Sequence, residues 1–212
     1  MENLVITISR EFGSGGRLVG EKLALNLGFL YYDKKLITLA SEKSGLSSDY
    51  IEQAENRASN SFLYNLSANY AYTANLYSIP NVYFQYDMPI DSKAYLAQVA
   101  VIREVAAKQS CVIVGRCANY ILRDDPSCYH FFVCADKKDR IERAVNLYHV
   151  DKAKAEETVV KTDKGRANYY RHHTGEDWGN MHDYALCVNT SVCGIDGAVA
   201  TIKAYLRENG KI

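Results

Sequence analysis

"ITISREFGSGGRLVGEKLA", residues 6–24, is the stretch that decides the fold of this chain. An apolar run at residues 4–8 predicts a buried strand, and glycines follow at positions 13, 15 and 16. An amphipathic stretch then begins at about Arg17 and continues at helical spacing to a glycine at position 28. Strand, glycine-rich turn and helix in this order are typical of a loop that binds phosphate.

This loop lacks the lysine that phosphate-binding loops usually carry. When the chain is aligned without gaps to the pattern G-x-x-x-x-G-K-[ST], Arg10 falls where the pattern has its first glycine. Gly16 falls where the pattern has its lysine. Arg17 falls where the pattern has serine or threonine. The positive charge of the missing lysine could come from Arg17, from Arg10 or from a more distant arginine. The alternative is a strand-to-helix turn whose glycines only permit tight packing.

Strand and helix patterns alternate along most of the chain. Apolar runs predict strands at residues 4–8, 29–33, 111–115, 129–135 and 184–190. Helical spacing predicts helices at residues 16–28, 34–45, 92–110, 136–148, 151–171 and 194–209. Residues 46–92 have a less regular pattern. The alternation predicts an α/β fold with a parallel sheet covered by helices on both faces.

Length, composition and charge limit the kinds of protein to which this chain can belong. The chain has 212 residues, which is typical of a single domain. Its formal net charge is zero, so we expect no general basic surface for nucleic acid. No apolar run approaches the roughly 18 residues of a membrane span, and the first residues do not resemble a signal peptide. We therefore expect a cytoplasmic protein without a membrane partner.

Cysteine and tyrosine are the two unusual residue types. None of the six cysteines forms a C-x-x-C pair, and several stand in apolar runs, which favours buried reduced thiols over a zinc site or disulfides. Many of the 17 tyrosines lie between Tyr50 and Tyr95, together with asparagines. These side chains suit recognition of a planar base, and they suit a homodimer contact equally well.

Two further motifs place arginines near the expected site. In "CVIVGRCANYIL", residues 111–122, Arg116 follows a strand and so stands at the sheet edge where ligands bind. It could grip a phosphate or form an ordinary ion pair. In "KTDKGRANYYRHH", residues 161–173, helical spacing puts Asp163, Arg166 and Tyr170 near one face. That face is either a closing lid or a solvated surface.

Together these motifs resemble the cytidylate kinase family, in particular its divergent cytidylate kinase-like branch. "ITISREFGSGG" is similar to the family's I-T-I-D-G-P-x-G-x-G-K except at the lysine, and "YYD" to its Y-x-D. "VGRCANYIL", "YHFFVCA", "DKKDRIERA" and "KTDKGRANYY" follow in the family's order. The resemblance covers nearly the whole chain and is weakest at residues 46–92.

The resemblance implies a three-layer P-loop kinase fold. Residues 1–212 would form a single domain, with a helical acceptor-binding insert at residues 46–92 and a lid at about residues 150–182. The implied activity is phosphoryl transfer from ATP to a nucleoside monophosphate, CMP or dCMP. The cofactors would be ATP and Mg²⁺, with Ser14 or Ser9 as candidate magnesium ligands in place of the usual hydroxyl.

The resemblance also assigns site residues. The phosphates of ATP would contact Gly13, Ser14, Gly15, Gly16 and Arg17. The monophosphate acceptor would contact Asp33, Arg103 and Arg116. The groups that act on the transferring phosphoryl, besides Arg17, would be Arg140, Arg143, Asp163 and Arg166.

Two departures leave other functions open. The loop lysine is absent, and Cys117 replaces the aspartate of the family's G-R-D motif. An ion pair with Glu104 is an alternative role for Arg103. A nucleotide-binding or sensor protein with impaired catalysis, or a kinase of another small metabolite, therefore remains an alternative.

Overall fold

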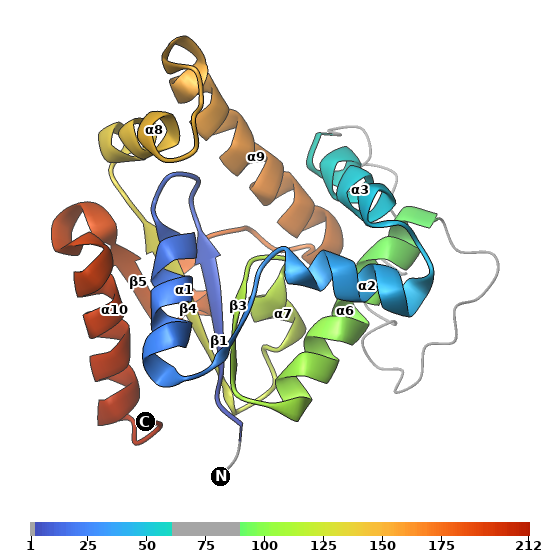
Figure 1. Cartoon of the computed structure of the whole chain (residues 1–212), viewed down its shortest axis with the longest axis horizontal. Helices are drawn as coiled ribbons and strands as arrows, with labels where there is room; N and C mark the ends of the chain where they lie inside the picture. Colours follow the sequence, from blue (N-terminus) through green and yellow to red (C-terminus); the bar gives the residue numbers. More distant parts are fainter. Residues whose placement is uncertain (1–2, 61–89) are drawn as a thin grey trace.

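The structure, a computed structural model, describes residues 3–60 and 90–212, and its centre is a five-stranded parallel sheet (Figure 1). The strands are β1 (Val5–Arg10), β2 (Leu30–Tyr32), β3 (Cys111–Val114), β4 (Cys128–Cys134) and β5 (Leu186–Asn189). Their spatial order is β2-β3-β1-β4-β5, and every neighbouring pair is parallel. The predicted α/β class with a parallel sheet is confirmed.

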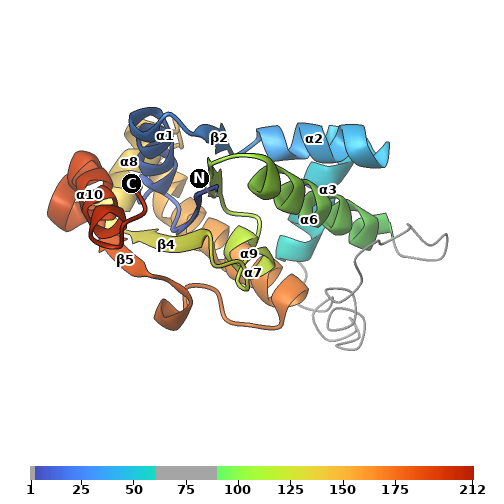
Figure 2. The same ribbon diagram turned by 90° about the horizontal axis from the view of Figure 1, so that it is seen from below.

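Helices connect the strands and cover the sheet. The longer ones are α1 (Gly16–Leu27), α2 (Lys35–Ser44), α3 (Ser48–Asn60), α6 (Ile90–Lys108), α8 (Lys137–Asn146), α9 (Ala155–Thr174) and α10 (Thr190–Glu208). The short elements are α7 (Ala118–Ile121), η1 (Lys152–Lys154) and η2 (Met181–Asp183). Figure 2 shows α1 and α10 near one another and α6 near α7. Among the described helices, none combines the length and apolar character needed to cross a membrane.

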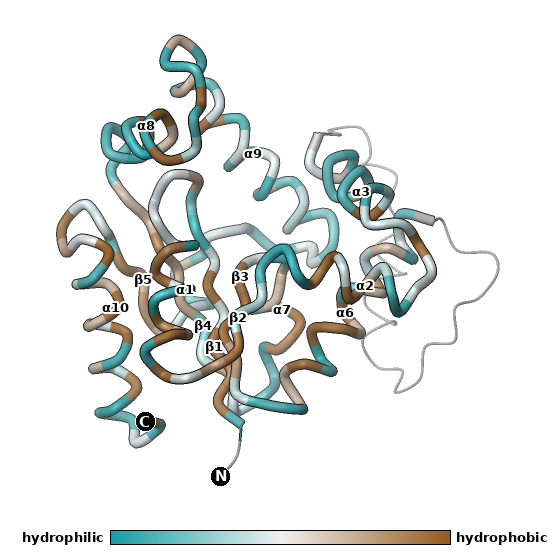
Figure 3. Tube along the Cα trace, viewed as in Figure 1, coloured by the Kyte–Doolittle hydropathy of each residue, from teal (hydrophilic) through white to brown (hydrophobic). Residues whose placement is uncertain are grey.

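Alternating side chains of the central strands build two cores. Ile6 and Ile8 point to one face of the sheet and pack with residues of α1 and α10. Val5 and Ile113 point to the other face and pack with residues of α2, α6 and α7. Figure 3 shows hydrophobic colours in the central strands, whereas α9 is largely hydrophilic. Because both faces are covered, the strands are mainly apolar, as is typical of parallel sheets.

Three boundaries differ from the sequence predictions. Residues 48–60 form α3, which differs from the less regular pattern of residues 46–92 but agrees with the helical character that the family resemblance implied there. Ile51 and Ala54 are buried there, and α3 gains its stability by packing on α9 and α6. Helix α9 continues to Thr174, and α10 begins at Thr190 with a non-helical Gly194 inside it. The remaining residues of the tyrosine-rich region, 61–89, lie outside the described residues.

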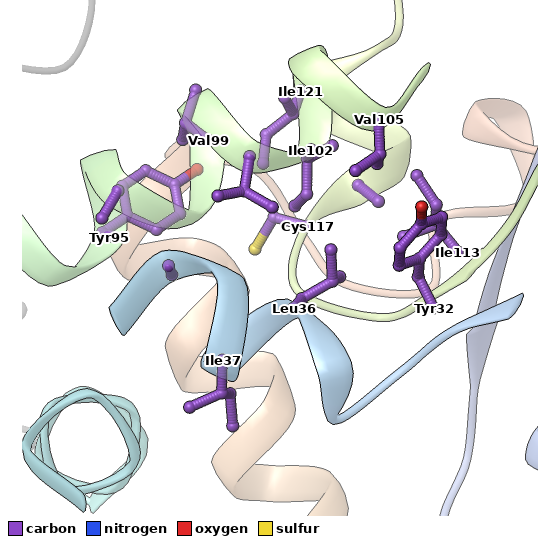
Figure 4. Close-up of a cluster of buried hydrophobic side chains, with 14 of the residues drawn as sticks. Tyr32, Leu36, Ile37, Tyr95, Val99, Ile102, Val105, Ile113, Cys117 and Ile121 are labelled. Carbon is purple, nitrogen blue, oxygen red and sulfur yellow. The ribbon is translucent and has the colours of Figure 1, made fainter. Parts of the chain in front are cut away.

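The cysteines follow the expected burial only in part. Cys111 and Cys117 are buried, whereas Cys187 and Cys193 are exposed. Figure 4 shows Cys117 within the apolar cluster that includes Leu36 and Ile102. Burial and the nearby carboxylate of Glu55 raise the pKa of the Cys117 thiol, so this side chain packs as a small neutral group.

Candidate active site

The glycine loop between β1 and α1 has a backbone shape that only glycine permits. Gly13 and Gly15 have φ angles of 78° and 82°, in the left-handed region. A Cβ atom at Gly13 would also overlap the backbone carbonyl of Arg140, and one at Gly15 would overlap the side chain of Ile195. The spacing of these glycines is therefore dictated by loop conformation and by close approach of α8 and α10.

The inner side of the loop offers hydrogen-bond donors without acceptors. Among the described residues, no protein acceptor is found for the backbone N–H groups of Gly13, Gly15, Arg17 and Leu18. The Ser14 hydroxyl accepts from the N–H of Gly16 at 3.3 Å. Free N–H groups in a glycine turn before a helix form an anion-binding site, so the loop fits phosphate oxygens.

The outer side of the loop is held by arginines of α8 and α9. The loop carbonyls accept hydrogen bonds from Arg166 Nη1 (Arg10 O, 2.9 Å), Arg140 Nε (Phe12 O, 2.8 Å) and Arg143 Nη1 (Gly13 O, 3.0 Å). These three arginines, predicted to act on the transferring group, thus contact the loop itself.

Asp163 joins α9 to the same loop. Its Oδ1 accepts from the N–H of Phe12 at 2.7 Å, and its carboxylate pairs with Arg140. Arg166 lies 3.6 Å away on the next helical turn. The predicted shared face of Asp163 and Arg166 is therefore present, whereas Tyr170 on the same helix turns to Asn119, whose Nδ2 donates to the tyrosine hydroxyl at 2.9 Å.

Positive charge dominates around the loop. Burial, and next the guanidinium of Arg10, lower the pKa of Arg166 to about 9. Burial also lowers the pKa of Arg10, and repulsion by the charge of Arg116 acts in the same direction. Burial raises the pKa of Asp163 although two arginines oppose that shift. Cations held this close together at the cost of mutual repulsion favour binding of an anion.

The acceptor side brings together residues from β2, β3 and α3. Arg116 donates from Nη1 to the backbone carbonyl of Asp33 at 3.1 Å and pairs through Nε with Glu55 at 3.1 Å. The Asp33 carboxylate lies 3.6 Å from both Arg116 and Arg17. Asp33 and Arg116 thus lie together, joined by Arg17, which was predicted to contact ATP instead, and Arg116 also forms the ion pair that was the alternative interpretation.

Arg103 lies apart from this group. It is exposed on α6, and none of the contacts that join Asp33, Arg116 and Arg17 includes it. Glu104, its candidate ion-pair partner, pairs with Lys43 and with Lys108.

Three residues of the acceptor side were missed by sequence reasoning. Glu55, Gln98 and Tyr169 come from α3, α6 and α9 and line a cavity of about 10 Å³, which has room for about one water. Within the described part of the chain, Gln98 Oε1 and Tyr169 Oη have no hydrogen-bond partner. The apolar pair Ile51 and Ala54, three positions apart, was a signal for a helix that would have pointed to Glu55.

The residues present do not build a dedicated magnesium site. The Ser14 hydroxyl donates to the carbonyl of Glu11 at 2.9 Å, and Ser9 donates to Asn119 at 3.4 Å, so both candidate ligands are engaged. The described residues also include no group of three or more His, Cys, Asp or Glu side chains that could hold a metal ion.

Comparisons with known proteins agree with this geometry. A sequence model described as "Cytidylate kinase-like family" matches residues 5–192. Among solved structures, an uncharacterized protein from Eubacterium ventriosum is 26% identical, with a TM-score of 0.71, over 97% of this chain and 99% of its own. No match was found among curated proteins.

Two shikimate kinases share the fold. The enzyme from Bacteroides thetaiotaomicron is 12% identical over 96% of this chain and 98% of its own, with a TM-score of 0.55. The enzyme from Acinetobacter baumannii, solved with shikimate, is 14% identical over 98% of this chain and 96% of its own, with a TM-score of 0.53. At these identities the likeness shows the P-loop kinase fold alone.

Proposed function

The chain belongs to the cytidylate kinase-like family, and from this premise we propose that it transfers the γ-phosphoryl group of ATP to a nucleoside monophosphate, CMP or dCMP. The single observation that carries the proposal is the glycine loop. Several of its N–H groups have no acceptor among the described residues, while arginines of α8 and α9 bind its carbonyls. Such a cradle suits the phosphates of a nucleotide.

The reaction needs little covalent chemistry from the protein. An oxygen of the acceptor phosphate attacks the γ-phosphorus, the bond to the β,γ-bridging oxygen breaks, and ADP leaves with the bonding electron pair. The protein's part is to align the two nucleotides and to balance the negative charge. The loop would hold ATP, and Asp33, Arg116 and Arg17 would hold the acceptor beside it.

The acceptor phosphate would replace a carboxylate on Arg116. In the structure, Glu55 occupies the Nε position of this guanidinium at 3.1 Å. Burial raises the pKa of Glu55, which opposes its charged form and makes this ion pair easier to exchange. A phosphate offers the guanidinium two oxygens and a bidentate contact, so the exchange favours the substrate.

A phosphoryl-transfer screen tests this function. Purified protein is incubated with Mg-ATP and, in turn, CMP, dCMP, UMP, AMP and GMP, and ADP formation is measured. We expect turnover with CMP or dCMP that falls at least about 100-fold in the Arg116→Ala variant, because an acceptor-phosphate contact is lost. The exposed Arg207→Gln variant on α10 is the matched control and should keep wild-type turnover.

One observation favours a nucleotide-binding protein without this turnover. Arg116 is already held between Asp33 and Glu55, and the loop lysine is absent. Measurable binding of ATP with no ADP formation from any of the five acceptors would support that alternative, or a kinase of another small metabolite. It would contradict the proposed transfer to CMP or dCMP.

A further inference from the structure

The side chain of Arg10 occupies the space beside Gly16. A Cβ atom built on Gly16 would overlap the Cβ of Arg10, would lie 3.0 Å from its Cγ and would lie 3.2 Å from the Cβ of Val133. The φ angle of Gly16 is not in the left-handed region, so its backbone alone does not require glycine. The missing side chain at position 16 is therefore a consequence of the arginine at position 10.

The guanidinium of Arg10 ends between the loop and the acceptor side. It lies against Gly115 at the end of β3, where an added Cβ would overlap Nη1 and lie 3.0 Å from Cζ. Its charge is attracted by Asp33 and repelled by Arg116, which places it beside both. The side chain thus points from the end of β1 toward the junction where two nucleotides would meet.

Arg10 is half-buried, and within the described part of the chain its guanidinium has no ion-pair or hydrogen-bond partner. Among residues 3–60 and 90–212, no carboxylate lies within 4.0 Å of it and no acceptor takes a hydrogen bond from it. Only the backbone carbonyl of Arg10 is engaged, by Arg166. An arginine has five N–H donors, so this half-exposed guanidinium beside the loop is available to the oxygens of an anionic ligand.

We propose that the positive charge of this phosphate loop has been transposed from position 16 to position 10. Arg10, at the first-glycine position, supplies the charge that a lysine at position 16 supplies in other loops, and its guanidinium binds the phosphoryl group in transfer. The arginine at position 10 and the glycine at position 16 depend on each other, because side chains at these two positions compete for the same space. This inference rests on the proposed function, since it names the residue that contacts the γ-phosphoryl group of ATP.

Nucleotide binding tests the contact. Mg-ATP and Mg-ADP are titrated by calorimetry into the wild type, Arg10→Gln and the exposed control Arg207→Gln. We expect Arg10→Gln to weaken ATP binding at least about tenfold while ADP binding changes less than about threefold, since only ATP carries the γ-phosphate. The control should bind both nucleotides as the wild type does.

The outcomes separate this inference from the proposed function. Equal ATP binding by the wild type and Arg10→Gln would overturn the transposition and leave the proposed function intact. Absence of ATP binding by the wild type would overturn the proposed function itself. Loss of the preference for ATP over ADP in Arg10→Gln alone supports the transposition.

Variants that restore glycine at position 10 test whether the side chains at positions 10 and 16 compete for the same space. They also test the proposal if Arg10→Gln does not fold. We expect Gly16→Ala to lower Tm by roughly 3–10 °C in the wild type, because its Cβ meets Arg10, and to have a much smaller effect in Arg10→Gly. The double variant Arg10→Gly/Gly16→Lys should regain the preference for ATP that Arg10→Gly loses. A folded double variant without that preference, or an equal effect of Gly16→Ala in both backgrounds, would overturn the proposal.

Discussion

At the scale of single residues, Arg116 and its neighbours show how a sequence departure is accommodated. Arg116 and Cys117 have φ angles of 53° and 54°, so the chain turns sharply after β3. The turn buries Cys117 in the apolar cluster of Figure 4, where an ionised aspartate would be costly. The carboxylates beside Arg116 come instead from Asp33 and Glu55.

Removal of Arg116 should therefore affect stability as well as acceptor binding. In Arg116→Ala, Glu55 loses its partner while remaining largely buried, and we expect a loss of about 1–3 kcal/mol in the free energy of unfolding. Urea denaturation measures this loss. The variant Arg116→Ala/Glu55→Gln should recover about half of it, and no recovery would show that Glu55 is not the group left uncompensated.

At the scale of elements, α9 acts as a clamp on the glycine loop. One turn of this helix presents Asp163 to the N–H of Phe12 and Arg166 to the carbonyl of Arg10. Arg140 of α8 closes the arrangement through its pair with Asp163. The loop therefore depends for its shape on two helices that lie more than 100 residues away in the sequence.

The clamp predicts a specific effect of Asp163→Asn. The amide keeps an acceptor for Phe12 but removes the charge that balances Arg140 and Arg166, so we expect a loss of about 1–3 kcal/mol in stability. Chemical denaturation checks this, with Lys164→Gln on the exposed side of α9 as the control. An unchanged free energy of unfolding would show that Asp163 does not hold the loop.

Elements also show where sequence patterns succeeded and failed. All five strands were predicted because short apolar runs are unambiguous when both faces of a sheet are covered. The pattern of helix α3 looked irregular because most of its residues are polar, and the helical character of this segment came only from the family resemblance; in the fold, packing of Ile51 and Ala54 helps to stabilise it. For the same reason the sequence did not indicate Glu55, whose place beside Arg116 depends on that packing.

At the scale of the whole molecule, buried histidines make the fold sensitive to acid. Burial lowers the pKa of His130 from 6.5 to about 4, and burial also lowers the pKa of His172 and His173. These histidines lie in β4 and in α9, so acid affects both the central sheet and this helix. Each is neutral in the folded state and must take up a proton on unfolding below its usual pKa.

The sign of the pH effect follows directly. Between pH 6.5 and about 4 the unfolded chain binds more protons than the folded one, so stability should fall as the pH falls. His130 contributes up to about 3 kcal/mol to this loss. His130→Gln should flatten the measured stability between pH 7 and 4.5, with the exposed His182→Gln as control. An unchanged slope in His130→Gln would contradict the assignment.

The sequence by itself determined the class of fold and the position of the glycine loop, because both follow from local patterns. Apolar runs of strand length and the positive φ angles of Gly13 and Gly15 belong to the local chain, whereas the close approach of Arg140 and Ile195 to these glycines is tertiary. Only the tertiary structure decided which arginine stands where. Arg140, Arg143 and Arg166 bind carbonyls of the loop, and Arg10 passes Gly16 and reaches Gly115, since a long side chain reaches groups that no sequence spacing relates.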